Sequence, residues 1–123
     1  MTFLFLEYPK CSTCQKAKAW LEEHHIDFAS RHIVENNPAA HELKEWYERS
    51  GLPLKRFVNT SGLLYKSMNL KDKLPNMSEE EQLNLLATNG MLVKRPLLIG
   101  KDFVLTGFKA EEWQNKLFPT TEV

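Results

Sequence analysis

Cysteine is scarce in this sequence: the 123 residues contain only two, Cys11 and Cys14, separated by Ser12 and Thr13. A structural disulfide framework spreads several cysteines along a chain to close long loops, so a single close pair argues against that class of protein. A lone pair at C-x-x-C spacing indicates thiol redox chemistry or metal binding instead.

Neither charge sign is in excess, because 16 lysines and arginines balance 16 aspartates and glutamates. This balance argues against direct nucleic-acid binding, which favours a basic surplus. Long apolar runs are also missing, since no segment approaches the ~20 residues of a membrane helix. The apolar run at residues 1–6 has no basic region before it and stops at Glu7, unlike a secretory signal. We therefore expect a cytoplasmic protein with no membrane segment.

Hydrophobic residues make up 42% of the chain, enough for one core, and we expect a single domain over residues 1–123. Apolar runs predict strands at residues 2–7, 26–34, 97–99 and 103–105. Helical periodicity and capping signals predict helices at residues 12–25, 37–51, 63–70, 78–90 and 109–117, followed by a tail at residues 118–123. The second helix is expected to use Asn37 as N-cap and Pro38 as its first residue. The fourth is expected to begin with a capping box at residues 78–81 and to close at Asn89–Gly90.

The order of these elements predicts an α/β fold. A strand–helix–strand unit joins parallel strands, and the last two strands form an antiparallel hairpin. The result is a mixed four-stranded sheet with helices on its faces and an inserted helical subdomain over about residues 37–90. A C-x-x-C pair that follows a strand and opens a helix is typical of the thioredoxin-like fold.

The position of the pair also predicts its chemistry. Cys11 is expected at a helix N-terminus, where unpaired N–H groups and the helix dipole stabilise a thiolate, and Lys10 adds positive charge. Cys14 follows one helical turn later, close enough to resolve a mixed disulfide on Cys11. We therefore predict a thiol–disulfide oxidoreductase with Cys11 as nucleophile and Cys14 as resolving cysteine.

Two other interpretations of the pair are weaker. A turn before a helix is not a core position, which argues against two inert buried residues. A zinc site needs four ligands, and His24 and His25 lie about 15 Å along the helix from Cys14. His32 could face the cysteines, but a single histidine does not complete the ligand set. We therefore expect no bound metal.

Two further groups are candidate binding residues. Arg95 could supply positive charge to an anionic substrate or thiolate, and Pro96, if cis, would bring backbone close to the sulfurs. The turn at residues 59–62 offers hydroxyls and the Asn59 amide, which can hold a carboxylate or oxyanion. The alternatives are a solvated surface arginine and ordinary capping of the next helix.

Several motifs together resemble the arsenate reductase (ArsC)/Spx family. They are residues 8–17 (YPKCSTCQKA), the helix that follows to Glu23, residues 94–99 (KRPLLI), and two segments similar to a small uncharacterised bacterial branch, residues 57–65 (FVNTSGLLY) and 69–74 (NLKDKL). The resemblance implies a thioredoxin-like fold with a helical insertion, Cys11 as catalytic or sensing cysteine, a cis Pro96 near it, and Arg95 as a site residue. We expect Cys11, Cys14 and Arg95 to be catalytic. The expected substrate-binding residues are Lys10, Ser12, Thr13, Asn59 and Pro96.

The same resemblance distinguishes three functions. Arsenate reductases of the family that use glutathione and glutaredoxin hold the oxyanion with one cysteine and three arginines, of which Arg95 matches one. The other two positions fall at Asn59 and at Thr106–Gly107, so an arsenate dianion would lose two of three charge-assisted contacts. Spx-type regulators bind the RNA polymerase α subunit and use a C-x-x-C switch, and Gly51 corresponds to a glycine of their polymerase-facing surface.

The regulators also carry a basic C-terminal extension that this sequence lacks, which favours the enzyme-like branch. We therefore expect an oxidoreductase that acts on a small thiol or oxidised thiol and holds no bound cofactor. Glutathione is the expected co-substrate, and glutaredoxin or thioredoxin is an expected redox partner. A regulator that binds RNA polymerase α and an arsenate reductase are the alternatives.

Overall fold

The computed structural model describes residues 2–119, so residues 120–123 of the predicted tail lie outside the described part. The strands are β1 (Phe3–Glu7), β2 (Phe28–His32), β3 (Leu97–Ile99) and β4 (Val104–Thr106). The α-helices are α1 (Ser12–Glu23), α2 (Ala40–Ser50), α3 (Leu63–Ser67), α4 (Leu70–Lys73), α5 (Glu79–Leu86) and α6 (Ala110–Leu117). Three short 3-10 helices are η1 (Leu54–Phe57), η2 (Leu74–Asn76) and η3 (Gly90–Leu92).

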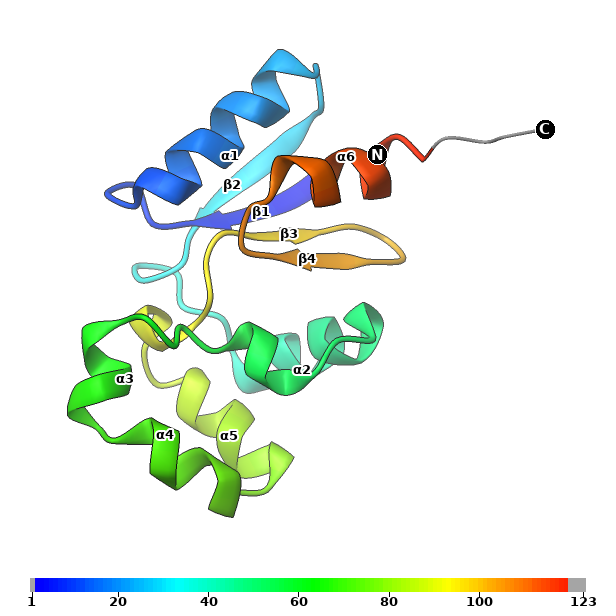
Figure 1. Cartoon of the computed structure of the whole chain (residues 1–123). Coiled ribbons are helices and arrows are strands. Elements are labelled where there is room, and N and C mark those ends of the chain that lie inside the picture. Colours follow the sequence, from blue (N-terminus) through cyan, green and yellow to red (C-terminus); the bar gives the residue numbers. More distant parts are fainter. Residues whose placement is uncertain (1, 120–123) are drawn as a thin grey trace.

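The four strands form one mixed sheet in the order β2-β1-β3-β4 (Figure 1). β1 is parallel to β2, with Phe3 opposite Phe28, and antiparallel to β3, which pairs with β4 as a hairpin. Helix α1 forms the crossover between β1 and β2. The predicted mixed four-stranded α/β sheet is therefore confirmed, and the loop after β1 places Cys11 at the end of a central strand.

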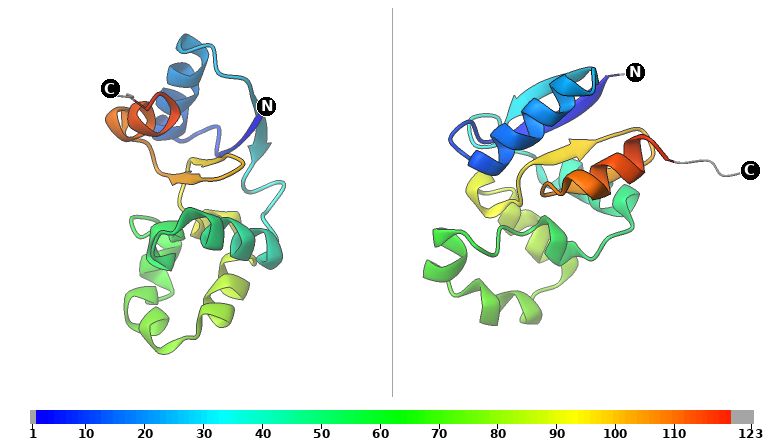
Figure 2. Two further views of the ribbon diagram at one scale, coloured as in Figure 1. Left: turned by 90° about the vertical axis from the view of Figure 1, so that its right-hand side faces the viewer. Right: turned by 45° about the horizontal axis from the view of Figure 1, so that its top comes forward.

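Helices α1 and α6 cover one face of the sheet, and the inserted helices from α2 to α5 lie on the other face (Figure 1, Figure 2). Successive residues of a strand point to opposite faces, so β1 and β3 each contribute to two clusters. Phe5 and Leu98 pack with α1 and with Trp113 of α6. Leu6 and Leu97 pack with the inserted helices. The sheet therefore joins two apolar layers.

The first inserted helix begins later than predicted. α2 starts at Ala40, so Asn37 as N-cap and Pro38 as first helical residue are wrong. The Glu42 carboxylate instead caps the helix, because it accepts a hydrogen bond from the Ala39 N–H at 3.0 Å. Asn37 instead donates to the carbonyl oxygen of Ala87 at 2.6 Å, which ties this segment to the end of α5.

Two other helix predictions are wrong in their limits. The single helix predicted at residues 63–70 is divided into α3 and α4 because Asn69 has a φ of 53°, a left-handed conformation that does not continue a helix. The predicted close of α5 at Asn89–Gly90 is also wrong. The Asn89 side chain accepts the Met91 N–H at 2.9 Å and begins η3 instead. The predicted capping box before α5 is confirmed.

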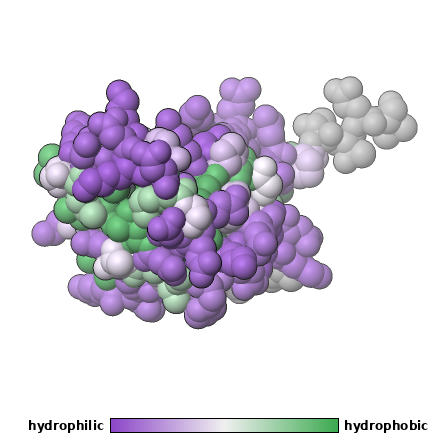
Figure 3. Space-filling model, turned by 90° about the horizontal axis from the view of Figure 1, so that it is seen from below, coloured by the Kyte–Doolittle hydropathy of each residue, from purple (hydrophilic) through white to green (hydrophobic). Residues whose placement is uncertain are grey.

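The inserted helices are short and amphipathic. On the face of the molecule turned away from the sheet, apolar side chains gather in the middle and polar ones surround them (Figure 3). In this part of the molecule Leu54, Val58, Leu70 and Leu74 help to line an apolar hollow of about 480 Å³. None of the helices within residues 2–119 is long and apolar enough to cross a membrane.

Candidate functional site

The cysteine pair lies where the chain passes from β1 into α1. A hydrogen bond from the Cys11 N–H to the Tyr8 carbonyl oxygen (2.9 Å) turns the chain, and α1 begins at Ser12. Cys11 is the N-cap of α1, and its sulfur accepts the Cys14 N–H at 3.4 Å. The predicted position of Cys11 at a helix N-terminus is confirmed, because the sulfur itself caps one of the helix donors that would otherwise lack a partner.

The surroundings of Cys11 favour its thiolate. Burial opposes ionisation most, but hydrogen bonds from the backbone and thiol of Cys14 and from the Thr13 N–H outweigh it, together with the positive charge of Arg95. The pKa of Cys11 is therefore lowered from its ordinary value. The thiol is free and partly exposed, so a substrate sulfur can approach it.

Cys14 has the opposite character. It is fully buried, and burial raises the pKa of its thiol to about 12, with the hydrogen bond and charge of Cys11 acting in the same direction. A backbone hydrogen bond at Tyr8 and the charge of Arg95 act against this rise without cancelling it. The pair thus combines a partly exposed, ionisable nucleophile with a buried, protonated thiol in hydrogen-bond contact.

Arg95 lies beside the cysteines on the segment that leads into β3. Its guanidinium carbon lies over the Tyr8 ring, 5.2 Å from the ring centroid, within range of a cation–π contact. The Arg95–Pro96 peptide bond is cis, and the Pro96 carbonyl oxygen accepts the Gly107 N–H at 2.8 Å. Nε and Nη1 of Arg95 are buried and have no hydrogen-bond partner among the described residues.

Cys11 borders a pocket of about 370 Å³ between the insertion and the edge of the sheet. The residues that line it are Cys11, Thr13, Arg56, Asn59, Ser61, Lys94, Arg95, Thr106, Gly107, Phe108, Lys109 and Glu112. Four of the residues predicted for the site are therefore brought together here. Lys10 and Ser12 are exposed and do not line the pocket, while Cys14 and Pro96 are buried.

Asn59 lines the pocket but is largely engaged with the protein itself. Its side-chain amide donates to the Met91 carbonyl oxygen at 3.2 Å, and its amide oxygen accepts the Ser61 hydroxyl at 3.4 Å. The expected alternative, in which the cluster at residues 59–62 caps the next helix, is wrong: Gly62 precedes α3 without a side-chain cap. A Cβ at Gly62 would lie 2.6 Å from the Asn59 amide nitrogen, so a larger residue there would have to displace the Asn59 side chain.

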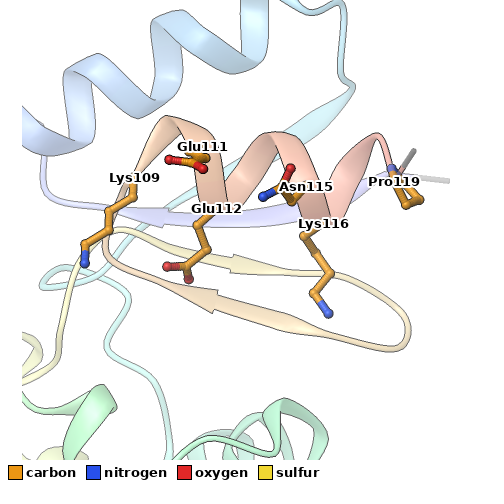
Figure 4. A pocket seen from close by; sticks show the side chains of 6 residues that line it. All are labelled: Lys109, Glu111, Glu112, Asn115, Lys116 and Pro119. Atoms are coloured by element: carbon orange, nitrogen blue, oxygen red, sulfur yellow. The ribbon is translucent and has the colours of Figure 1, made fainter. Parts of the chain in front are cut away.

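Thr106, which the resemblance had placed near the oxyanion, lines the pocket together with Arg56, Lys94 and Lys109, three cations that sequence reasoning did not assign to the site. They come from η1, the loop before β3, the end of β4 and the residue before α6, so no local motif connects them. Figure 4 shows Lys109 and Glu112 extending from the first turn of α6 on the side of strand β4. Arg56 reaches Glu112 across the pocket at 3.8 Å. The position of Lys94 directly before Arg95 was the one signal available in the sequence.

The histidines take part in local packing. Nδ1 of His32 accepts the N–H groups of Val34 and Glu35, and its ring packs edge-on against Tyr8 at 5.8 Å between centroids. His24 is bonded through Nδ1 to the Trp20 carbonyl oxygen at 2.8 Å. Within residues 2–119 no group of three or more His, Cys, Asp or Glu side chains is arranged to hold a metal ion.

Comparison with known proteins connects this geometry to a family. Residues 6–116 match the model of the ArsC family. The chain is 54% identical over 114 residues to the uncharacterised protein YusI of Bacillus subtilis, covering 93% of this chain and 97% of that protein. It is 31% identical over 108 residues to the regulatory protein MgsR of the same organism, covering 88% of this chain and 84% of that protein.

Solved structures give the same result. An ArsC family related protein from Bacteroides fragilis superposes with a TM-score of 0.90 at 60% identity, covering 94% of this chain and 97% of that one. A protein described as a possible arsenate reductase from Streptococcus mutans superposes with a TM-score of 0.84 at 46% identity, covering 92% and 98%. The predicted thioredoxin-like fold with its helical insertion is thereby confirmed.

Proposed function

We propose, from the premise that this chain belongs to the ArsC family, that it is a thiol–disulfide oxidoreductase with Cys11 as nucleophile and Cys14 as resolving cysteine. The observation that carries the proposal is the contrast between the two thiols. Cys11 has a lowered pKa at a helix N-terminus, and the buried Cys14 thiol, with a pKa of about 12, contacts it. Exchange by way of a mixed disulfide uses one reactive thiolate to attack the substrate and a second thiol to resolve the intermediate.

The reaction has two displacements. The Cys11 thiolate attacks one sulfur of a substrate disulfide, a bond forms between them, and the other half leaves as a thiolate that takes a proton from water. Cys14 then loses its proton to water and attacks the Cys11 sulfur, which releases the second substrate thiolate and leaves a Cys11–Cys14 disulfide. Two electrons pass from the protein to the substrate. A thiol reductant restores the dithiol, and we propose glutathione, glutaredoxin or thioredoxin for this step.

The first displacement prepares the second. The hydrogen bond and negative charge of Cys11 are two of the causes that raise the pKa of Cys14. Both disappear once Cys11 enters a mixed disulfide, so the Cys14 pKa falls when its thiolate is needed. Arg95, whose charge lowers the pKa of both thiols, remains in place throughout.

The test is disulfide reduction by the purified chain with glutathione as electron donor. We expect Cys11→Ser to lose the activity by at least about a hundredfold, as removal of a covalent nucleophile does. Cys14→Ser should instead accumulate a mixed disulfide at Cys11, detected by mass spectrometry. Equal activity of Cys11→Ser and the wild type would contradict the proposal.

A redox-sensing regulator is the second candidate function. The similarity to MgsR favours it, as does Gly51, which ends α2 with a φ of 68° and has no atom within 4 Å of the position that a Cβ would take. An exposed glycine of this kind leaves space for a partner to approach the backbone. Binding of the RNA polymerase α subunit by a chain without disulfide or arsenate turnover is the result that would favour this function over the enzyme.

A further inference from the structure

The pocket beside Cys11 concentrates positive charge in a chain whose charges otherwise balance. Four cationic side chains line it, Arg56, Lys94, Arg95 and Lys109, and Glu112 is the one lining carboxylate within the described residues. Glu112 lies 3.8 Å from Arg56 and offsets part of that charge. The other cations form a surplus that attracts an anionic ligand, since charges of one sign around a cleft reinforce one another.

Two buried groups in the same pocket lack a protein partner. The hydroxyl of Thr106, a residue only 5% exposed, makes no hydrogen bond within the described residues, and neither do Nε and Nη1 of Arg95. A buried polar group without a partner destabilises the fold, because it has lost its hydrogen bonds to water. Both groups can donate hydrogen bonds, so a ligand that carries acceptor oxygens would satisfy them.

The four cations come from separate segments of the chain that line the pocket. Arg95 lowers the pKa of Cys11 more than any other charged side chain does. Lys94 lies along Gly107, where a Cβ would be 3.1 Å from Lys94 Cε, and Gly107 directly follows Thr106. A single tetrahedral oxyanion would fill only a small part of the 370 Å³ that Cys11 and Lys94 both line. A longer ligand, with sulfur at one end and negative charge at the other, could contact both Cys11 and Lys94.

We propose that this pocket selects disulfides whose sulfur substituents carry a carboxylate, with Lys94 and Thr106 as specificity-determining residues that bind that carboxylate. The proposal rests on the proposed function and names its substrate class. The displacement at Cys11 is unchanged. What the pocket adds is a charge-assisted hydrogen bond from the Lys94 ammonium and one from the Thr106 hydroxyl.

The test compares three small disulfides in single-turnover reactions with the reduced full-length chain: dianionic dithiodipropionate, neutral bis(hydroxyethyl) disulfide and dicationic cystamine. Each rate is divided by the rate of the same disulfide with free mercaptoethanol, so that differences between leaving thiols cancel. We expect the normalised rate for the dianion to exceed that for the dication by at least about tenfold at low salt, and the preference to shrink at high salt.

Two variants locate the preference. Lys94→Gln should lower the dianion-to-dication ratio by about tenfold, the effect of one charge-assisted hydrogen bond. The matched control is Lys101→Gln, which removes the same charge from the exposed turn between β3 and β4 and should leave the ratio unchanged. Thr106→Val should lower the ratio without lowering the free energy of unfolding, because the hydroxyl that it removes has no protein partner.

The outcomes distinguish a failure of the carboxylate selection from a failure of the oxidoreductase function on which it rests. If Cys11 reacts with none of the disulfides faster than a free thiol does, the oxidoreductase function fails. If it reacts quickly with all three at equal normalised rates, the oxidoreductase stands and the carboxylate selection is wrong. Equal losses of the ratio in Lys94→Gln and Lys101→Gln would show a general charge effect and overturn the assignment. Competition by sulfate or arsenate as strong as that by dithiodipropionate would overturn it in favour of a small-oxyanion site.

Discussion

Arg95 illustrates how much one side chain contributes to this site. It lies against Tyr8, its charge lowers the pKa of both cysteines, and two of its donor nitrogens are buried without a partner among the described residues. A lysine would supply the charge but not the planar fork of donors. The guanidinium therefore couples the reactive sulfur to whatever anion enters the pocket.

Removal of this charge should change the pH dependence of Cys11. The thiolate is the reactive form, so the rate of alkylation by iodoacetamide rises as pH increases through the pKa of Cys11. Because Arg95 lowers that pKa, Arg95→Gln should move the midpoint of the rate profile to higher pH. The profile is measured by mass spectrometry in a Cys14→Ser background, with Lys101→Gln as the charge-matched control. A midpoint that is the same in Arg95→Gln and the control would contradict the assigned role.

At this scale the sequence predicts residues that act through a local motif and misses those that meet only in the fold. Cys11 and Cys14 were identifiable because the helix that positions them begins between them. Arg56 and Lys109 were not, because they lie far apart in the sequence and both line the pocket at Cys11 only when the insertion folds against the sheet. Asn59, predicted to bind substrate, does line the pocket, although its amide nitrogen bonds to the Met91 carbonyl oxygen.

The secondary-structure elements show the same contrast between local patterns, which the sequence predicts, and long-range contacts, which it does not. The positions of the four strands and of helix α1 along the chain follow from local apolar patterning and were predicted within two residues at each end. The start of α2 was not, because Asn37, a good N-cap by type, finds a partner fifty residues away in Ala87. Glu42 then caps α2 and also binds Arg31 of β2. Long-range hydrogen bonds of this kind override local preference and cannot be seen in a window of sequence.

The Arg31–Glu42 pair should hold the insertion to the sheet. Two hydrogen bonds, of 2.7 and 2.9 Å, join the guanidinium to the carboxylate, and they lower the pKa of Glu42 to about 2. We expect Glu42→Gln to lower the free energy of unfolding at neutral pH by about 1.5–3 kcal/mol. Glu45→Gln on the same helix is the control, because its exposed pair with Arg49 should contribute only about 0.5 kcal/mol.

The pH dependence of that loss has a definite sign. In the unfolded chain Glu42 titrates near pH 4.5, whereas in the folded chain it stays ionised down to about pH 2. The stabilisation is therefore complete above pH 4.5 and is lost as pH falls from there toward 2. Urea unfolding at several pH values should show the wild type and Glu42→Gln converging over this range. A difference that stays constant with pH, or losses that match those of Glu45→Gln, would exclude the pair as the main tie.

The whole molecule is organised around one sheet with an apolar layer on each side. Leu97 and Leu98 are adjacent in β3, both fully buried, yet Leu97 packs with the inserted helices and Leu98 with α1 and α6. Cys11 and its pocket lie where the two layers meet, with lining residues from both. A site assembled in this way depends on the two layers folding together.

That dependence predicts a single cooperative unfolding transition. Leu97→Ala and Leu98→Ala each delete buried contacts on one side only, and each should lower the free energy of unfolding by about 2–5 kcal/mol. Because β3 is shared, either variant should reduce the amide-exchange protection of α1 and α5 alike under conditions where exchange requires global unfolding. Amide exchange measured by mass spectrometry resolves the two helices. If Leu97→Ala weakened protection in α5 alone and left α1 at its original value, the insertion would be an independent folding unit, and the pocket would open without loss of the sheet.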